Sequence, residues 1–102
     1  MRLVRFRPQA RAEIREARGW YENRVAGLGR AFISEVDTTI SLFRLHPHMY
    51  AAVGDDEQVR RALLHRFPYS LVYEIIADEI VVLACRHVRQ DEMKWNLARR
   101  DV

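Results

Sequence analysis

Six basic side chains fall on carboxyl-terminal segments whose alternating pattern predicts neighbouring β-strands. They are Arg60, Arg61, Arg66, Arg86, His87 and Arg89. Cleavage of an RNA phosphodiester needs a base, a proton donor and cations around the phosphate, and His87 with arginines offers part of that chemistry. Glu74, the one acid inside these strands, is better explained as a strand residue paired with an arginine. The pattern therefore favours binding of an anion or an acidic partner over catalysis.

Other kinds of chemistry find little support in the sequence. The four histidines are divided between a predicted loop and two separate strands, without metal-ligand spacing; they are His46, His48, His65 and His87. Cys85 lies inside an apolar run and resembles a buried small hydrophobic residue more than an activated thiolate. Gly27 and Gly29 lie between two predicted helices, which is the wrong context for a phosphate-binding loop. We therefore expect neither a metal nor a cofactor.

The positive charge is unevenly distributed along the chain. Of the 17 basic residues 16 are arginine, whose planar guanidinium favours bidentate contact with phosphates and carboxylates. The net charge is +4 over residues 1–18, −3 over 19–59 and +3 over 60–100. If the two basic ends meet in the fold, they form a positive face that attracts nucleic acid or an acidic protein segment. The alternative is that the arginines only solvate helix faces.

Length and composition bound the class of protein. With 102 residues and 49% apolar residues, the chain has the size of one compact domain, which we expect to span residues 1–102. The longest nearly apolar run, Ile80 to Cys85, is too short to cross a bilayer, and the first residues do not develop a signal peptide. A single cysteine excludes an internal disulfide. We expect a soluble cytoplasmic protein.

The first half of the chain predicts a strand followed by two helices. Leu3–Phe6 alternates apolar and basic residues, and Pro8 suits the first turn of a helix that ends near Asn23. Glycines at 27–29 mark a tight reversal, after which a second helix continues to the residue before Pro47. Each helix has an apolar stripe at helical spacing: Ala10, Ile14, Ala17 and Tyr21 in the first, and Phe32, Val36, Ile40 and Phe43 in the second.

The second half predicts a small sheet. Residues 47–58 have no sustained period and are expected to form a loop. Three strand-like runs follow, and their short connections make neighbouring strands antiparallel; they are Val59–Phe67, Tyr69–Ile76 and Ile80–His87. Residues 93–100, with Trp95, are a candidate short helix. The order β-α-α-β-β-β predicts an α+β fold in which the helical hairpin covers one face of an antiparallel sheet and leaves the other exposed.

Motifs along nearly the whole chain resemble those of a known family. The less specific ones are Phe6-Arg7-Pro8-Gln9-Ala10, Trp20-Tyr21-Glu22, Gly27-Leu28-Gly29 and Pro47. The more specific ones are Val59-Arg60-Arg61, Arg66-Phe67-Pro68-Tyr69-Ser70-Leu71-Val72-Tyr73, and His87-Val88-Arg89 with Trp95 beyond it. In order and spacing they are similar to the RelE/ParE superfamily of toxins from type II toxin–antitoxin pairs, often called plasmid stabilisation proteins.

The resemblance implies a bacterial toxin that is held inactive by an antitoxin encoded beside it. A disordered segment of the antitoxin would cover the helical hairpin and the sheet. RelE-like members cut messenger RNA on the ribosome with Lys, Arg and a C-terminal Tyr, whereas ParE-like members poison DNA gyrase. Here the strand region has no lysine, and Trp95 lies near where the Tyr is expected. These departures favour the ParE-like branch, with gyrase as the inherited target and mRNA cleavage as the alternative.

The basic residues form the expected target surface. Its members are Arg60, Arg61, Arg66, Arg86, His87, Arg89 and Trp95. If the chain is a ribonuclease, Arg61, Arg66 and Arg89 would hold the phosphate. His87 would then transfer a proton.

The antitoxin is expected on the helical hairpin. Ile33 and Leu42 lie off the main apolar stripe and are still apolar, which is typical of a surface covered by a partner. The expected contact residues are Trp20, Leu28, Phe32, Ile33 and Leu42. A third alternative is a module that has lost its toxicity and only pairs with its antitoxin.

Overall fold

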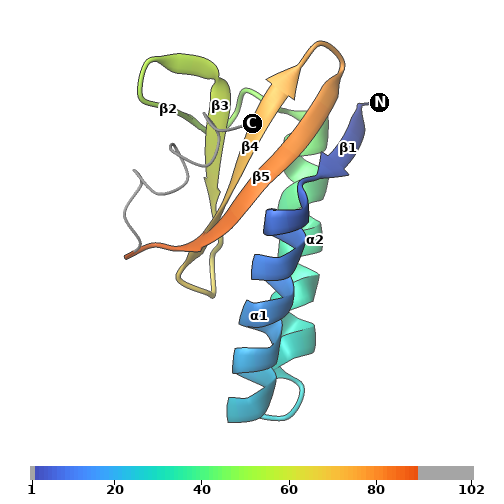
Figure 1. Ribbon diagram of the computed structural model, residues 1–102, viewed down its shortest axis with the longest axis vertical. Coiled ribbons are helices and arrows are strands. Elements are labelled where there is room, and N and C mark those ends of the chain that lie inside the picture. Colours follow the sequence, from blue (N-terminus) through green and yellow to red (C-terminus); the bar gives the residue numbers. More distant parts are fainter. Residues whose placement is uncertain (1, 90–102) are drawn as a thin grey trace.

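The computed structural model describes residues 2–89 as two helices and five strands (Figure 1). In chain order they are β1 (Leu3–Phe6), α1 (Pro8–Arg24), α2 (Leu28–Leu45), β2 (Ala51–Val53), β3 (Asp56–Leu63), β4 (Tyr69–Ile76) and β5 (Glu79–His87). The predicted α+β class is confirmed. The candidate helix over 93–100 lies outside the described residues.

The strands form one sheet in the order β1-β5-β4-β3-β2. Strands that follow one another from β2 to β5 are antiparallel, whereas β1 runs parallel to β5, with Leu3 opposite Glu79 and Phe6 opposite Val82. The sheet is therefore mixed, and the prediction of a purely antiparallel sheet is wrong at this edge. Short connections dictate antiparallel pairing only between consecutive strands, and β1 reaches β5 across the whole described chain.

The segment predicted as a loop contains a further strand. β2 pairs with β3 through Ala51 opposite Arg61 and Ala52 opposite Arg60, and the register shifts before Val53. Gly54 in the connection has a φ of 60°, a left-handed conformation that favours glycine. Three residues are too few for an alternating pattern to stand out in the sequence.

β3 ends at Leu63, four residues before the end predicted from the sequence. The chain turns at residues 64–68, hereafter the β3–β4 turn. The N–H of Leu64 donates to the carbonyl of Tyr69 at 2.9 Å, and the N–H of Tyr69 donates to the carbonyl of Phe67 at 2.7 Å. Phe67, expected as the last strand residue, places its ring in the core from this turn.

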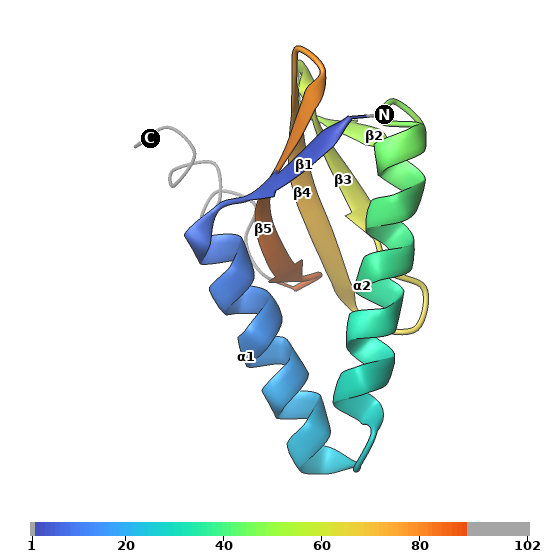
Figure 2. The ribbon, with the colours of Figure 1, turned by 90° about the vertical axis from the view of Figure 1, so that its right-hand side faces the viewer.

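Both helices cover one face of the sheet, meet at their connecting turn and separate toward the strands (Figure 2). The helical stripes are confirmed, because six of their eight residues are buried and Ile14 and Ile40 are partly buried. The rings of Phe43 and Tyr73 stack at 4.0 Å, and the Tyr73 hydroxyl donates to the carbonyl of Pro47 at 2.6 Å. This contact joins the end of α2 to the centre of β4. No helix in the described part of the chain is long and apolar enough to cross a membrane.

The opposite face of the sheet has a small apolar cluster of its own. Val59, Val72, Leu83 and Ala84 are each at most 5% exposed. Val72 lies opposite Ala84 and Tyr73 opposite Val82, so Leu83 is an extra residue in β5. This bulge lets two consecutive residues join the same cluster. The expectation of an exposed second face is therefore wrong at its centre.

The turn between the helices depends on glycine. Gly27 has a φ of 89°, which disfavours other residues. The Glu22 carboxylate accepts hydrogen bonds from the N–H groups of Gly27 and Gly29, each at 2.9 Å, and so caps the start of α2. These bonds, the largest cause, lower the pKa of Glu22. A Cβ on Gly29 would lie 2.9 Å from the carbonyl oxygen of Arg18.

We predict opposite effects of alanine at two glycines. Gly29→Ala should lower the free energy of unfolding by about 1–3 kcal/mol, because the added Cβ would collide with the Arg18 carbonyl oxygen and the Glu22 side chain and push α2 away from α1. Gly19→Ala, within α1 and with nothing within 4 Å, should raise it by about 0.5–1 kcal/mol through helix propensity. Urea unfolding of both variants measures the difference, and equal stabilities would contradict the close approach.

Candidate functional site

Arg60 is bonded to the backbone of its own fold. It lies opposite Tyr73, and its Nε donates to the carbonyl of Glu57 at 2.8 Å. Its Nη1 donates to the carbonyls of Tyr50 at 2.9 Å and His48 at 3.4 Å. These bonds fasten β3 to the segment between α2 and β2. The sequence predicted that the Arg60 guanidinium binds the target, but part of this group already donates hydrogen bonds within the chain.

Arg61 lies on the other face of β3. It pairs across the sheet with Val72, a member of the second apolar cluster, and it is exposed. Successive strand residues point to opposite faces, so Arg60 and Arg61 cannot share one patch.

Arg66 is held at the β3–β4 turn by a carboxylate from α2. Glu35 accepts hydrogen bonds from the N–H of Arg66 at 2.9 and 3.1 Å, and also from the N–H of His65. The Arg66 guanidinium lies 5.5 Å from the centre of the Phe67 ring and is exposed. The backbone of this arginine is thus fixed while its charge faces solvent.

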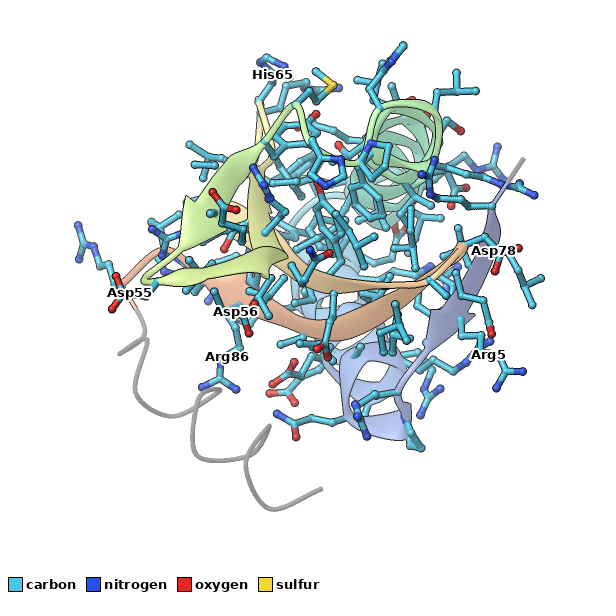
Figure 3. All side chains as sticks on the ribbon, turned by 90° about the horizontal axis from the view of Figure 1, so that it is seen from above. Arg5, Asp55, Asp56, His65, Asp78 and Arg86 are labelled. Carbon is cyan, nitrogen blue, oxygen red and sulfur yellow. The ribbon has the colours of Figure 1, made fainter. Side chains whose placement is uncertain are left out.

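Arg86 forms an ion pair with α1. Its Nη1 lies 2.5 Å from the Glu13 carboxylate, and the two side chains are only 13% and 19% exposed. The other Glu13 oxygen accepts the N–H of Cys85 at 2.9 Å. The pair fastens α1 to β5 and neutralises the charge of Arg86. In Figure 3 His65, the neighbour of Arg66 in the β3–β4 turn, lies on the opposite side of the view from Arg86. The predicted basic residues therefore do not form one cluster.

His87 and Arg89 line a groove between α1 and the end of β5. The groove has a volume of about 650 Å³. It exists because β1 pairs with β5 only as far as Val82, which leaves the later residues of β5 open toward α1. The His87 ring packs edge-on against Tyr69 at 5.2 Å, and its Nδ1 accepts the N–H of Arg89 at 3.1 Å. We call this the α1–β5 groove.

Several residues in this groove were not identified as site residues from the sequence, among them Glu16 and Tyr69. Glu16 and Tyr69 line it together with His87, Arg89 and Trp20. Glu16 comes from α1, far from the strands in the chain, and no spacing rule connects them. A carboxylate, an imidazole, a guanidinium and a phenol around one groove are components of acid–base chemistry on a phosphodiester.

Cys85 has no role as a nucleophile. Its side chain is 2% exposed, and burial raises the pKa of its thiol to about 12. At neutral pH the sulfur is therefore protonated, and the interpretation as a buried hydrophobic residue is confirmed. Within residues 2–89, His, Cys, Asp and Glu do not form a group of three or more that could hold a metal ion.

The residues expected to contact the antitoxin are dispersed over the hairpin. Trp20 is 51% exposed, lines the α1–β5 groove and stacks with Arg24 at 4.2 Å. Leu28 is half-buried at the start of α2, and Leu42 is 38% exposed near its end. Ile33 is half-buried between the two helices.

Phe32 is not available to the antitoxin, contrary to the prediction from the sequence. It is 0% exposed, and its ring packs against Tyr21, Phe67 and Tyr69 at 5.2–5.5 Å. Its position in the main stripe of α2 already implied burial, and the structure leaves no part of the ring for a partner.

A second groove lies between the helices at the β1 side. It has a volume of about 310 Å³. Its apolar lining comes from Phe6, Ile14, Ile33, Val36 and Ile40, and its charged residues are Arg11, Arg15 and Asp37. We call it the hairpin groove. An apolar floor with two arginines beside it suits an amphipathic acidic segment.

These surfaces and the β-α-α-β-β-β-β order define a small α+β protein with separate polar and apolar grooves. The chain belongs to the ParE toxin family: the model of the ParE toxin of the type II toxin-antitoxin system, parDE, matches residues 4–92. No curated protein sequence matches it. In solved structures the fold is similar to that of a chain of the chromosomal ParDE system from P. aeruginosa and of the isolated E. coli RelE toxin.

The two structural similarities extend over most of each molecule. The P. aeruginosa chain gives a TM-score of 0.69 at 16% identity, covering 85% of this chain and 96% of that one. The RelE toxin gives a TM-score of 0.68 at 16% identity, covering 100% of both chains. At such identity the likeness shows the shared fold and carries no residue roles.

We predict that two of the arginines differ in their effect on stability. Arg60→Ala should lower the free energy of unfolding by about 1–3 kcal/mol, because it removes the bonds that hold the segment before β2. Arg66→Ala should change it by less than about 0.5 kcal/mol, because its side chain is exposed. Denaturant titration compares them; an Arg60→Ala protein as stable as Arg66→Ala would refute the structural role of Arg60.

Proposed function

We propose that this chain is a toxin that inhibits growth by binding an essential target, with DNA gyrase as the candidate, and that a cognate antitoxin neutralises it. Membership of the ParE toxin family is the observation that carries this proposal. The target would meet the exposed arginines at the end of the sheet, Arg66 and Arg89. Arg86 supports that end from within through its ion pair with Glu13, whereas Arg60 is bonded to the segment between α2 and β2.

Binding is favoured over cleavage by the dispersion of the candidate catalytic residues. Arg61 lies on the second face of the sheet, Arg66 lies in the β3–β4 turn, and only His87 and Arg89 share a groove. Cleavage requires its groups to converge on one phosphate. The residues named from the sequence do not converge in this way.

Messenger RNA cleavage is the second candidate, and one observation favours it. Glu16 lines the α1–β5 groove together with His87 and Arg89, which supplies a carboxylate next to the histidine and the arginine. In this reaction Glu16 would act as the base, His87 as the acid and Arg89 as the cation next to the phosphate.

Incorporation of labelled thymidine and labelled methionine after induction without antitoxin separates the candidates. We expect an early fall in DNA synthesis. The double variant Arg66→Ala, Arg89→Ala should abolish this fall at unchanged protein level, and Arg5→Ala, near the opposite end of β5, should not. An early fall in protein synthesis that Glu16→Gln removes would support mRNA cleavage and contradict action by binding alone. No fall in either would leave a module that only pairs with its antitoxin.

For the antitoxin, we propose the hairpin groove as the main contact. Ile33→Glu should weaken antitoxin binding at least tenfold, because it places a carboxylate in an apolar lining. Ile76→Glu, an equivalent change at a 47% exposed site on the sheet, should leave the affinity unchanged. Calorimetric titration of the two variants measures the difference, and equal affinities would exclude the hairpin groove.

A further inference from the structure

The β3–β4 turn contains two backbone N–H groups that the sheet does not use. They belong to His65 and Arg66, the two exposed residues between the buried Leu64 and Phe67. Within residues 2–89 these N–H groups have no carbonyl acceptor, and both converge on the carboxylate of Glu35. Consecutive N–H groups that converge in this way form a concave site for an anion. The turn is therefore shaped around a negative charge that α2 supplies.

Glu35 is carried by a well-anchored part of α2. It lies in the sequence between Phe32 and Val36, which are 0% and 3% exposed in the core. Its own carbonyl accepts the hydroxyl of the buried Thr39 at 2.8 Å, and its side chain is half-buried. A functional side chain is held in place only as firmly as the residues that support it. The Glu35 carboxylate therefore reaches the β3–β4 turn from a fixed base.

The carboxylate fixes the origin of the Arg66 side chain without neutralising its charge. Both Glu35 oxygens accept the N–H of Arg66, at 2.9 and 3.1 Å. The Arg66 guanidinium is exposed, lies 5.5 Å from the centre of the Phe67 ring and forms no ion pair with another residue of the described part of the chain. A side chain whose backbone is ordered beforehand loses less entropy when it binds a partner. Arg66 is thus a charged group with a prepared position.

We propose that Glu35 is a positioning residue of the target surface, which acts on the target only through Arg66. This proposal rests on the proposed function, in which Arg66 contacts the target, and it adds what places that arginine. The proposal differs in sign from a simple charge effect. Removal of the Glu35 charge makes this end of the sheet more positive, which by attraction alone would strengthen binding of an acidic target. Loss of the position of Arg66 weakens that binding instead.

Glu35→Gln tests the proposal, because glutamine keeps the size of the side chain but has one acceptor oxygen and no charge. The measured quantity is the toxin level, without antitoxin, at which incorporation of labelled thymidine falls by half. Glu35→Gln should raise this level about fivefold or more. Asp78→Asn makes the matching change at an exposed acid in the β4–β5 turn and should alter it less than about twofold. A Glu35→Gln protein as toxic as the unmodified chain, or more toxic, would overturn the proposal.

Coupling with Arg66 separates positioning from a general loss of stability. Arg66→Ala alone should raise the same toxin level and leave the residual toxicity that Arg89 carries. Addition of Glu35→Gln to Arg66→Ala should then change the level by less than about 1.5-fold, because no guanidinium remains to be positioned. An effect of Glu35→Gln that is equally large with and without Arg66 would show that Glu35 supports only the fold, and it would overturn the proposal.

Glu35→Asp supplies the same comparison if Glu35→Gln does not fold. It retains the charge and withdraws the carboxylate by one methylene group, so the toxin level should rise about twofold or more, and this rise should vanish in the Arg66→Ala background. A rise that persists there would overturn the positioning role. The absence of any fall in DNA synthesis with the unmodified chain would instead refute the proposed function. A normal fall with the unmodified chain and an equal one with Glu35→Gln would refute only the role of Glu35.

Discussion

Four aromatic rings meet where the two helices, the β3–β4 turn and β4 come together, and the other features are arranged around this contact. Tyr21, Phe32, Phe67 and Tyr69 lie with centroids 4.8–6.1 Å apart in five pairs. Such pairs add about 0.5–1.5 kcal/mol each beyond burial. Each ring comes from a different segment, so the cluster fixes the spread of the hairpin, the position of the turn with Arg66 and one wall of the α1–β5 groove.

Three glutamates of the helices add contacts to other segments beyond those of the aromatic cluster. Glu13 accepts the backbone N–H of Cys85 at the open edge of β5, and Glu22 accepts that of Gly27 at the start of α2. Glu35 accepts the backbone N–H of Arg66 in the β3–β4 turn. A carboxylate strengthens such bonds because it is charged. The consequence is electrostatic: Glu13 also neutralises Arg86, whereas Glu35 binds only the backbone of Arg66 and leaves its exposed guanidinium charged.

Features that depend on local pattern could be predicted, and those that depend on distant pairing could not. The apolar stripes located both helices, and the alternating runs located β4 and β5. The parallel position of β1 and the three residues of β2 have no local signal. In the site, the sequence predicted Arg60 and Arg86 as surface charges, because their partners have no local signal. Arg60 binds backbone carbonyls, and Arg86 binds a carboxylate 73 residues away. Glu16 lines the same groove as His87 only because α1 packs on β5.

The parallel pairing of β1 with β5 also determines when the chain can fold. Leu3 has its partner at Glu79, so the first strand stays without its neighbour until nearly all described residues have left the ribosome. Pairings of such sequence separation form late because loop closure precedes their stabilising contacts. The α1–β5 groove and the Glu13 contact depend on the same step. During synthesis the sheet therefore stays incomplete at this edge, and the α1–β5 groove forms only after β5 has been made.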